Sequence, residues 1–188
     1  NSAHGRVPPH ETAKAKNFGV ISMGLGGIGG RPGKDGLATM AFPSGVGTIP
    51  IEVTETQCPL YFKRKEFLAD SGGAGQWRGG ISQAIEIANR EAAPFTISAA
   101  TFDRIRNPAL GRDGGKPGRK GAARHGSGKA LPDKGIHVIA TGDSLILELP
   151  GGGGFGNPKV RARELVEADL RSELITAASA RNDYGYDA

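Results

Sequence analysis

The stretch LILELPGGGGFGNP, Leu145 to Pro158, decides the fold prediction, because an alternating apolar run meets four consecutive glycines and then Asn-Pro. Its residues Gly151, Gly153 and Gly156 match the spacing G-x-G-x-x-G after a predicted strand and before a predicted helix, a setting typical of dinucleotide-binding loops. However, no second parallel strand with an acidic ribose ligand follows, and no Lys follows Gly156 as a phosphate loop requires. We therefore predict that the glycines are architectural, in a turn where neighbouring backbones pass too close for any Cβ.

Glycine is used at more than twice its usual frequency in this chain. Of 188 residues, 31 are glycine and 12 are proline, whereas average glycine usage is about 7%. The apolar residues fall in short runs between these turn-forming residues, which is typical of short strands joined by many turns. The length permits one well-buried domain and does not require two.

Alternation of apolar and polar residues predicts a series of strands. The runs are Thr48 to Thr56, Leu60 to Leu68, Ile81 to Ala88 and Pro94 to Phe102. Pro50 should push the first of them to a sheet edge, because proline has no N–H to donate to a ladder. Two further runs, GIHVIATGD and SLILELP, predict a hairpin around Thr141-Gly142-Asp143. This density of strands favours an all-β sandwich or barrel.

Beyond Pro158 the apolar period changes to that of a helix. Val166, Leu170 and Leu174 recur every fourth residue, so we predict an amphipathic helix over Lys159 to Leu174 with Asn157 as its N-cap. A second short helix is predicted from Thr176 to Asp183, ending near Gly185.

These elements together predict a mainly β fold, sandwich-like or barrel-like with Gly-rich turns, followed by a C-terminal pair of helices. Residues 1–17 are expected to be a flexible lead-in. Residues 18–158 form the predicted β-rich domain, and residues 159–188 form a helical segment packed on it.

Positive charge is concentrated in one segment of the chain. Residues 103–134 hold nine Lys or Arg and three Asp, a net charge of +6 where the whole chain has +5. A polyanion-binding loop on a β domain is one interpretation. No aromatic residue interleaves the basic ones, so stacking platforms for nucleic acid are absent from the segment. We favour a solvated loop and expect no nucleic-acid partner.

The sequence predicts neither a metal site nor a membrane span within this chain. Its single cysteine, Cys58, excludes an internal disulfide, and its four histidines share no short metal-ligand spacing. No apolar run approaches the ~18–20 residues that a membrane span needs, so we predict a cytoplasmic protein. The opening NSAHGRVPPHETAKAKN lacks an initiator Met, which favours a piece of a longer polypeptide.

The loop RPGKDG, Arg31 to Gly36, holds charged groups in a path fixed by flanking glycines. One interpretation is a surface turn with a local pair between Lys34 and Asp35, which contributes well under about 1 kcal/mol. The other is that Arg31 and Asp35 contact a substrate or a partner subunit. These two residues are our candidate site residues, and no catalytic residue is predicted.

Five separated blocks, in chain order, are similar to one known family. They are GGIGGRPGKDG, IPIEVTE, DSGGAGQWRGG, GRDGGKPGRKG and GDSLILELPGGGGFGNP. Together with the ending VRARELVEADLRSELITAASARNDYG, they resemble the C-terminal half of the hydantoinase B and 5-oxoprolinase family. The resemblance runs from about Gly26 to Gly185.

The resemblance implies a subunit of an ATP-dependent cyclic amide hydrolase. Such B-type subunits work with an ATP-binding hydantoinase A type subunit to open 5-oxoproline or an N-substituted hydantoin, and relatives carboxylate ketones such as acetone and acetophenone. ATP and a divalent metal are expected in the complete hetero-oligomer, but neither in this chain. We expect the chain to be a scaffold and subunit interface without activity of its own.

Two departures from the family pattern limit what carries over. The family's metal-binding His and Asp cluster lies in an N-terminal part that this chain does not contain, so that part is itself an expected partner. The stretch LATMAFPSGVGTIPIEVTE also lacks a THMTNT-like segment of the oxoprolinase branch. The hydantoinase-like and carboxylase-like branches therefore both stay open.

Overall fold

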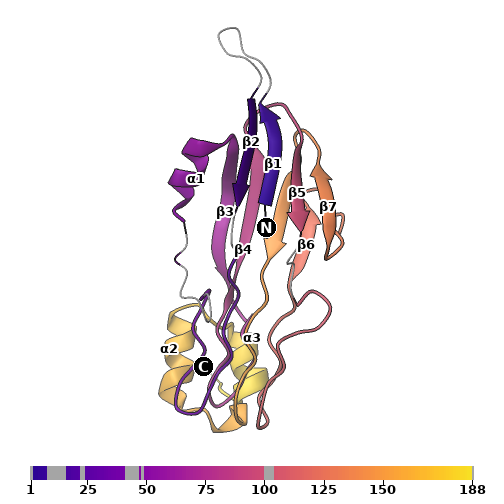
Figure 1. Cartoon of the computed structure of the whole chain (residues 1–188). Helices are drawn as coiled ribbons and strands as arrows, with labels where there is room; N and C mark the ends of the chain where they lie inside the picture. Colours follow the sequence, from indigo (N-terminus) through magenta and orange to yellow (C-terminus); the bar gives the residue numbers. More distant parts are fainter. Residues whose placement is uncertain are drawn as a thin grey trace.

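The computed structural model describes residues 2–7, 16–21, 24–40, 47, 49–99 and 104–187. Within these residues, two four-stranded antiparallel sheets stack in the upper half of an elongated molecule (Figure 1), with strand orders β2-β1-β5-β7 and β3-β4-β8-β6. The strands are β1 (Ser2–Val7), β2 (Lys16–Ile21), β3 (Leu60–Leu68), β4 (Ser82–Asn89), β5 (Phe95–Ala99), β6 (Ala122–His125), β7 (Gly135–Ile139) and β8 (Ser144–Glu148). The predicted mainly β sandwich is confirmed.

The two sheets face each other across an apolar core. Alternation along β8 sends Leu145 and Leu147 inward, where they lie opposite Ile87 and Ile85 of β4. The other sheet contributes Phe95 of β5, which is 2% exposed. Each such side chain contributes about 1.5–3 kcal/mol through burial, so this core is the main apolar source of stability in the upper half.

The hairpin predicted around Thr141-Gly142-Asp143 is wrong. β7 pairs with β5 in one sheet, whereas β8 pairs with β4 and β6 in the other. The connection therefore crosses from sheet to sheet. The chain crosses here because the residues on both sides of the turn are buried. Ile139 and Leu145 are both 0% exposed and enter the core from opposite layers.

The strand predicted over Thr48 to Thr56 is also wrong, since Ile51–Gln57 forms helix α1. Thr54 N–H donates to Pro50 O, and Thr54 is the buried residue of the helix. The helix is held by contact with β3, where Glu55 Oε1 accepts from Phe62 N–H at 2.8 Å. This tertiary contact overrides the strand propensity of the β-branched residues.

The lead-in expected at residues 1–17 contains a strand. β1 pairs with β2 on one side and with β5 on the other. Its sequence, SAHGRV, is too polar for periodicity to reveal it. Ala3 enters the apolar core, and two backbone ladders fix the position of the strand. Residues 8–15 lie outside the described residues.

The C-terminal part is helical as expected, but the first helix is interrupted. Asn157 Oδ1 accepts from Lys159 N–H at 3.0 Å and caps a 3-10 turn, η1 (Pro158–Val160). Arg161 and Ala162 are extended, so α2 begins only at Arg163 and runs to Arg171.

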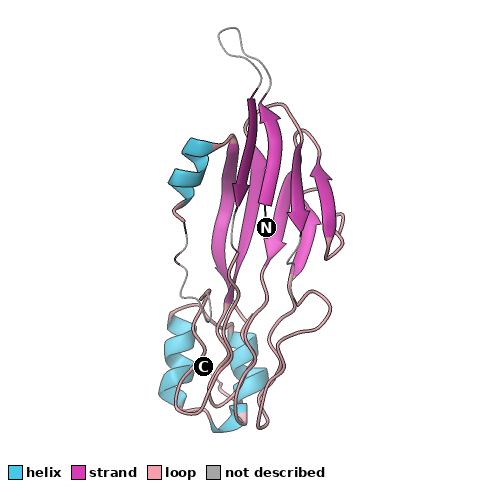
Figure 2. Ribbon diagram, in the orientation of Figure 1, coloured by secondary structure: helices cyan, strands magenta, loops and turns pink. Residues whose placement is uncertain are grey.

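The chain ends with α3 (Ala177–Ser179) and the π-helical turn η2 (Ala180–Tyr184), which Gly185 terminates at φ +68°. Strands occupy one end of the molecule, while loops, α2 and α3 occupy the other (Figure 2). None of the helices in the described residues is long and apolar enough to cross a membrane.

Candidate functional site

Four glycine-rich segments run side by side below the sheets (Figure 1). We call them the glycine layer; they are residues 24–36, 71–80, 109–118 and 150–156. They exchange backbone hydrogen bonds directly, such as Gly73 N–H to Gly152 O at 2.8 Å, Gly152 N–H to Gly80 O at 3.0 Å and Gly80 N–H to Ile28 O at 2.7 Å. The layer therefore satisfies its peptide groups between segments without forming regular strands.

The segments lie too close together for side chains. A Cβ on Gly152 would stand 2.0 Å from Ile28 O, one on Gly79 would stand 2.0 Å from Gly152 O, and one on Gly151 would stand 1.7 Å from Ser71 O. Real Cβ atoms essentially never approach within 3.0 Å of another heavy atom. Glycine is the residue that this spacing admits.

The Gly151 to Gly156 run uses most of its amides in hydrogen bonds within the chain. The N–H groups of Gly151, Gly152, Gly154 and Gly156 donate to backbone carbonyl oxygens elsewhere in the chain, at 2.9 to 3.0 Å. A phosphate-binding loop needs such N–H groups free and convergent. The architectural interpretation of this run accords with its geometry.

A buried ionic network joins the glycine layer to the C-terminal helices. The Arg161 side chain is 0% exposed, and its Nη1 and Nη2 donate to the two oxygens of Asp35 at 2.7 and 2.8 Å. Nη2 also donates to Asp169 Oδ2 at 2.8 Å. Arg78 completes the network, since its Nε donates to Asp169 Oδ2 at 3.1 Å and its backbone N–H to Asp35 Oδ1 at 2.6 Å.

The network shifts the ionisation of its members. Burial raises the pKa of Asp35, but the hydrogen bond and charge of Arg161 and the backbone N–H of Arg78 outweigh it and hold the pKa below its usual value. Burial likewise opposes the charge of Arg161, yet Asp35 and Asp169 raise its pKa. Tyr184, whose ring lies 5.9 Å from the Arg161 guanidinium, has its pKa raised by burial to about 12.

The structure places the two predicted site residues in different surroundings. Asp35 faces inward, bonded to Arg161 rather than to its neighbour Lys34. Arg31 is exposed in a tight turn, where its N–H donates to Lys34 O and Lys34 N–H returns a bond to Arg31 O, both at 3.0 Å. Among the described residues, no hydrogen bond or ion pair engages the Arg31 side chain. Asp35 is thus held in the ionic network, and a subunit or substrate contact at Arg31 and Asp35 stays a prediction.

Sequence reasoning missed three members of the network, Arg78, Arg161 and Asp169. One signal was present: Asp169 lies three residues after Val166 and one before Leu170, on the apolar stripe of α2. A carboxylate in that position needs a buried cation. The identity of the cation could not be read locally, because Arg161 lies on an extended break and Arg78 lies 91 residues away.

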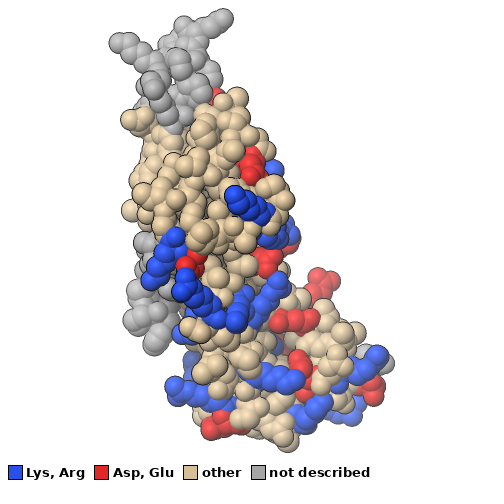
Figure 3. Space-filling view, turned by 90° about the vertical axis from the view of Figure 1, so that its right-hand side faces the viewer, with Lys and Arg blue, Asp and Glu red and all other residues tan. Residues whose placement is uncertain are grey.

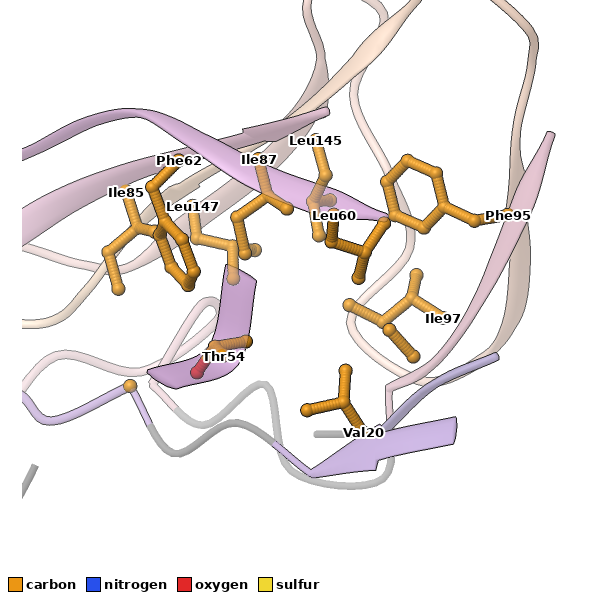
Figure 4. A pocket seen from close by; sticks show the side chains of 12 residues that line it. Val20, Thr54, Leu60, Phe62, Ile85, Ile87, Phe95, Ile97, Leu145 and Leu147 are labelled. Carbon is orange, nitrogen blue, oxygen red and sulfur yellow. The ribbon is translucent and has the colours of Figure 1, made fainter. Parts of the chain in front are cut away.

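Neither the pocket between the sheets nor a cluster of metal-ligating side chains supplies a reactive centre in the described residues. The pocket between the sheets is lined by apolar side chains and one hydroxyl, that of Thr54 (Figure 4). In the described ranges, no three His, Cys, Asp or Glu side chains come together as metal ligands. Asp35 and Asp169 already accept bonds from arginine, so they do not fit the divalent metal expected in the complete complex.

Four basic side chains of the segment 103–134 pair with acids, of which Asp133 lies in the segment itself and the others lie further along the chain. Arg106 pairs with Asp133, Lys116 with Asp183, and both Arg119 and Arg124 with Glu148. Blue and red side chains are interspersed over this part of the surface (Figure 3). The charge of four of the nine basic side chains is therefore offset by a carboxylate.

Fold and site together define a β-sandwich above a glycine layer, in which buried arginine and aspartate side chains bond to one another. The sequence model described as Hydantoinase B/oxoprolinase matches residues 2–158. Because this match covers most of the chain, the chain belongs to that family, as the five glycine-rich blocks predicted.

Relatives place the chain within longer proteins. The B-type subunit of a putative D-/L-hydantoinase from Pseudomonas sp. (strain NS671) is 32% identical over 167 residues, which are 85% of this chain and 28% of that protein. The structure of the ATP-dependent caprolactamase from Pseudomonas jessenii matches 98% of this chain and 33% of that chain, with a TM-score of 0.80 and 23% identity. The nucleotide-free structure of acetone carboxylase matches 98% of this chain and 29% of that chain, with a TM-score of 0.70 and 20% identity. These superpositions show a shared fold, and the chain spans between 28% and 33% of the three proteins.

We expect the double substitution Gly152→Ala and Gly153→Ala to destabilise the chain by about 2–6 kcal/mol, because each added Cβ meets backbone that must move. The Cβ of Gly153 would stand 2.2 Å from Leu110 O. Thermal unfolding followed by circular dichroism measures the loss. Gly47→Ala is the control, since a Cβ there meets nothing within 4 Å. Equal stability of the two proteins would contradict the packing argument.

Arg161→Met should cost about 3–5 kcal/mol in urea unfolding, because it removes the cation of the half-buried Asp35 and leaves the buried Asp169 with Arg78 alone. The matched control is Arg181→Met, which removes an ion pair to Asp187 whose side chains are 70% and 84% exposed. That exposed pair should contribute at most about 1 kcal/mol. If both variants lose the same stability, the network does not have the structural role described above.

The lowered pKa of Asp35 predicts that the stability of the folded chain decreases in acid. Its folded-state pKa lies below the unfolded value of about 3.9, so its contribution is present above that pH and disappears as pH falls through the folded pKa. We expect Asp35→Asn to be less stable than wild type at pH 7, with the difference narrowing below about pH 4. Melting temperatures of both proteins between about pH 2 and 7 provide the test. A constant difference across this range would show that ionised Asp35 contributes nothing.

Proposed function

We propose that this chain is the C-terminal domain of a B-type subunit of an ATP-dependent cyclic amide hydrolase, where it acts as scaffold and subunit interface. Family membership supports the assignment to such a subunit. The observation that carries the scaffold role is the mutual satisfaction of the site: glycine amides bond to carbonyls, and Asp35 and Asp169 bond to Arg161.

The substrates that fit this proposal are unstrained cyclic amides, such as an N-substituted hydantoin or 5-oxoproline. An unstrained lactam resists hydrolysis, so transfer of a phosphoryl group from ATP to its carbonyl oxygen makes the ring carbon a better electrophile for water. The hydantoinase A type subunit would bind the ATP. The remainder of the B-type subunit would supply the reactive groups, and the complex would be a cytoplasmic hetero-oligomer.

In such a complex the described residues would support the subunits that bind ATP and substrate and would not react themselves. The glycine layer and the network fix the lower half rigidly against the sandwich, so surfaces that meet the other polypeptides keep a defined shape. Preorganisation of this kind reduces the entropic cost of assembly and of holding a substrate. Arg31, exposed on a turn closed by two backbone bonds, is the charged group best placed for such a contact.

The alternative is a subunit of an ATP-dependent ketone carboxylase. The superposition on acetone carboxylase keeps it open, since the fold is shared by both classes and does not separate them. The chemistry does separate them, because a carboxylase consumes bicarbonate with its ketone, whereas a cyclic amide hydrolase consumes water.

The test is reconstitution of the complete B-type subunit with its hydantoinase A type partner, ATP and Mg²⁺. We expect ADP release coupled to ring opening of a hydantoin, 5-oxoproline or caprolactam, and no turnover by the 188-residue chain alone. Ring opening by the isolated chain would contradict the scaffold role. Loss of acetone or acetophenone that depends on bicarbonate would instead establish the carboxylase.

A further inference from the structure

The outward faces of the two sheets differ in charge. On the β3-β4-β8-β6 sheet, Glu86 pairs with Lys63 and Glu148 pairs with Arg124, so charges are interleaved across the strands. Figure 3, which looks at the β7 side of the molecule, shows an upper half largely free of charged side chains. The β7 strand belongs to the β2-β1-β5-β7 sheet.

On that sheet the register places a patch of apolar and small side chains outward. Ala3 and Ile97 point into the core, so their neighbours along β1 and β5 point out. The patch, which we call the outer patch, consists of Ser2, His4, Ile21, Thr96, Ser98, Ile136 and Val138. Ile21, Ile136 and Val138 are 67%, 74% and 60% exposed. Asp, Glu, Lys and Arg are absent from these positions.

The outer patch is bounded by an unprotected strand edge. β7 pairs with β5, and in the described residues no backbone bond reaches its other side. Its sequence, GIHVI, contains neither Lys nor Pro, the residues that commonly blunt an edge. The Nε2 atom of His137 on this strand is also buried without a hydrogen-bond partner among those residues.

The edges of the other sheet are covered, whereas the described residues show no cover on β7 or on β2, the two edges of this sheet. Residues 129–131 fold back on β6, where His125 N–H donates to Lys129 O and Leu131 N–H donates to Ala123 O, both at 2.8 Å. Helix α1 lies against β3 and contacts Phe62 through Glu55. An open edge beside an apolar patch is suited to strand addition, in which main-chain bonds supply affinity and the patch supplies contact area.

We propose that the remainder of the B-type subunit covers this surface, adding a strand along β7 and packing apolar side chains on the outer patch. This inference rests on the proposed function. The matched relatives carry two thirds or more of their length outside the region shared with this chain, so the domain has a permanent neighbour in them. Permanent interfaces are more apolar than transient ones, which fits a patch without charge and disfavours an exchangeable polar partner.

Hydrogen exchange tests the proposed strand addition. In the isolated chain, the β7 amides that do not bond to β5 should exchange rapidly. In the complete B-type subunit they should exchange at least about 100-fold more slowly, while the amides of β6 should change little. Equal exchange of β7 in both proteins would overturn the proposal.

Substitutions test whether the outer patch matters more than other exposed apolar residues do. Val138→Lys introduces a charge on the patch, and Phe67→Lys is its matched control, because Phe67 is 59% exposed on β3 of the other sheet. Both variants should keep the wild-type melting temperature in the isolated chain. In the complete subunit, Val138→Lys should remove the protection of β7 and lower the melting temperature, whereas Phe67→Lys should do neither. Val138→Thr, which keeps the shape and strand propensity, should have an intermediate effect if the lysine variant does not fold.

Two other occupants are distinguished by the same measurements. If protection of β7 in the isolated chain rises with protein concentration, a second copy covers the edge and the proposal is wrong. If protection appears only when the hydantoinase A type subunit is added, that subunit is the occupant and the proposal is again wrong. Failure of the complete complex to open a cyclic amide would contradict the proposed function alone, since the exchange measurement does not depend on turnover.

Discussion

Close approach of glycine backbones is the constraint on which the rest of this structure depends. The glycine layer continues directly from one sheet: residues 71–80 join β3 to β4, residues 109–118 precede β6, and residues 150–156 follow β8. The layer therefore determines where all four strands of that sheet enter the sandwich. A side chain in the layer would separate segments that now exchange hydrogen bonds, and the displacement would be carried into the core above.

Arg161 gives this layer its connection to the end of the chain. The residue interrupts what would otherwise be one continuous helix, so that its guanidinium reaches Asp35 in the layer and Asp169 in α2 at the same time. Two carboxylates and a second arginine make the buried charge acceptable, because each member has a partner of opposite sign. The apolar cluster of Val166, Ile175 and Ala180 then packs beside it.

The sequence predicts the parts of this protein that depend on local pattern. Alternation identifies the strand at Leu60 to Leu68, and the Asn157 cap and the Gly185 terminus agree with the structure. What failed depends on distant contacts. The alternation around Ile51 is overridden by packing on β3, and β1 is revealed only by its pairing with β5, far along the chain. The local Lys34–Asp35 pair, one of the two interpretations of that loop, does not form, because the cation bonded to Asp35 lies 126 residues further along the chain.

The composition of the glycine layer has a consequence for the thermodynamics of unfolding. Exposure of apolar surface raises the heat capacity of a protein, and exposure of peptide groups lowers it. Because the layer is built mainly of backbone, its melting releases much polar and little apolar surface. The free energy of unfolding of this chain should therefore vary less steeply with temperature than that of a domain of equal length with an ordinary core, giving a broad and shallow stability curve.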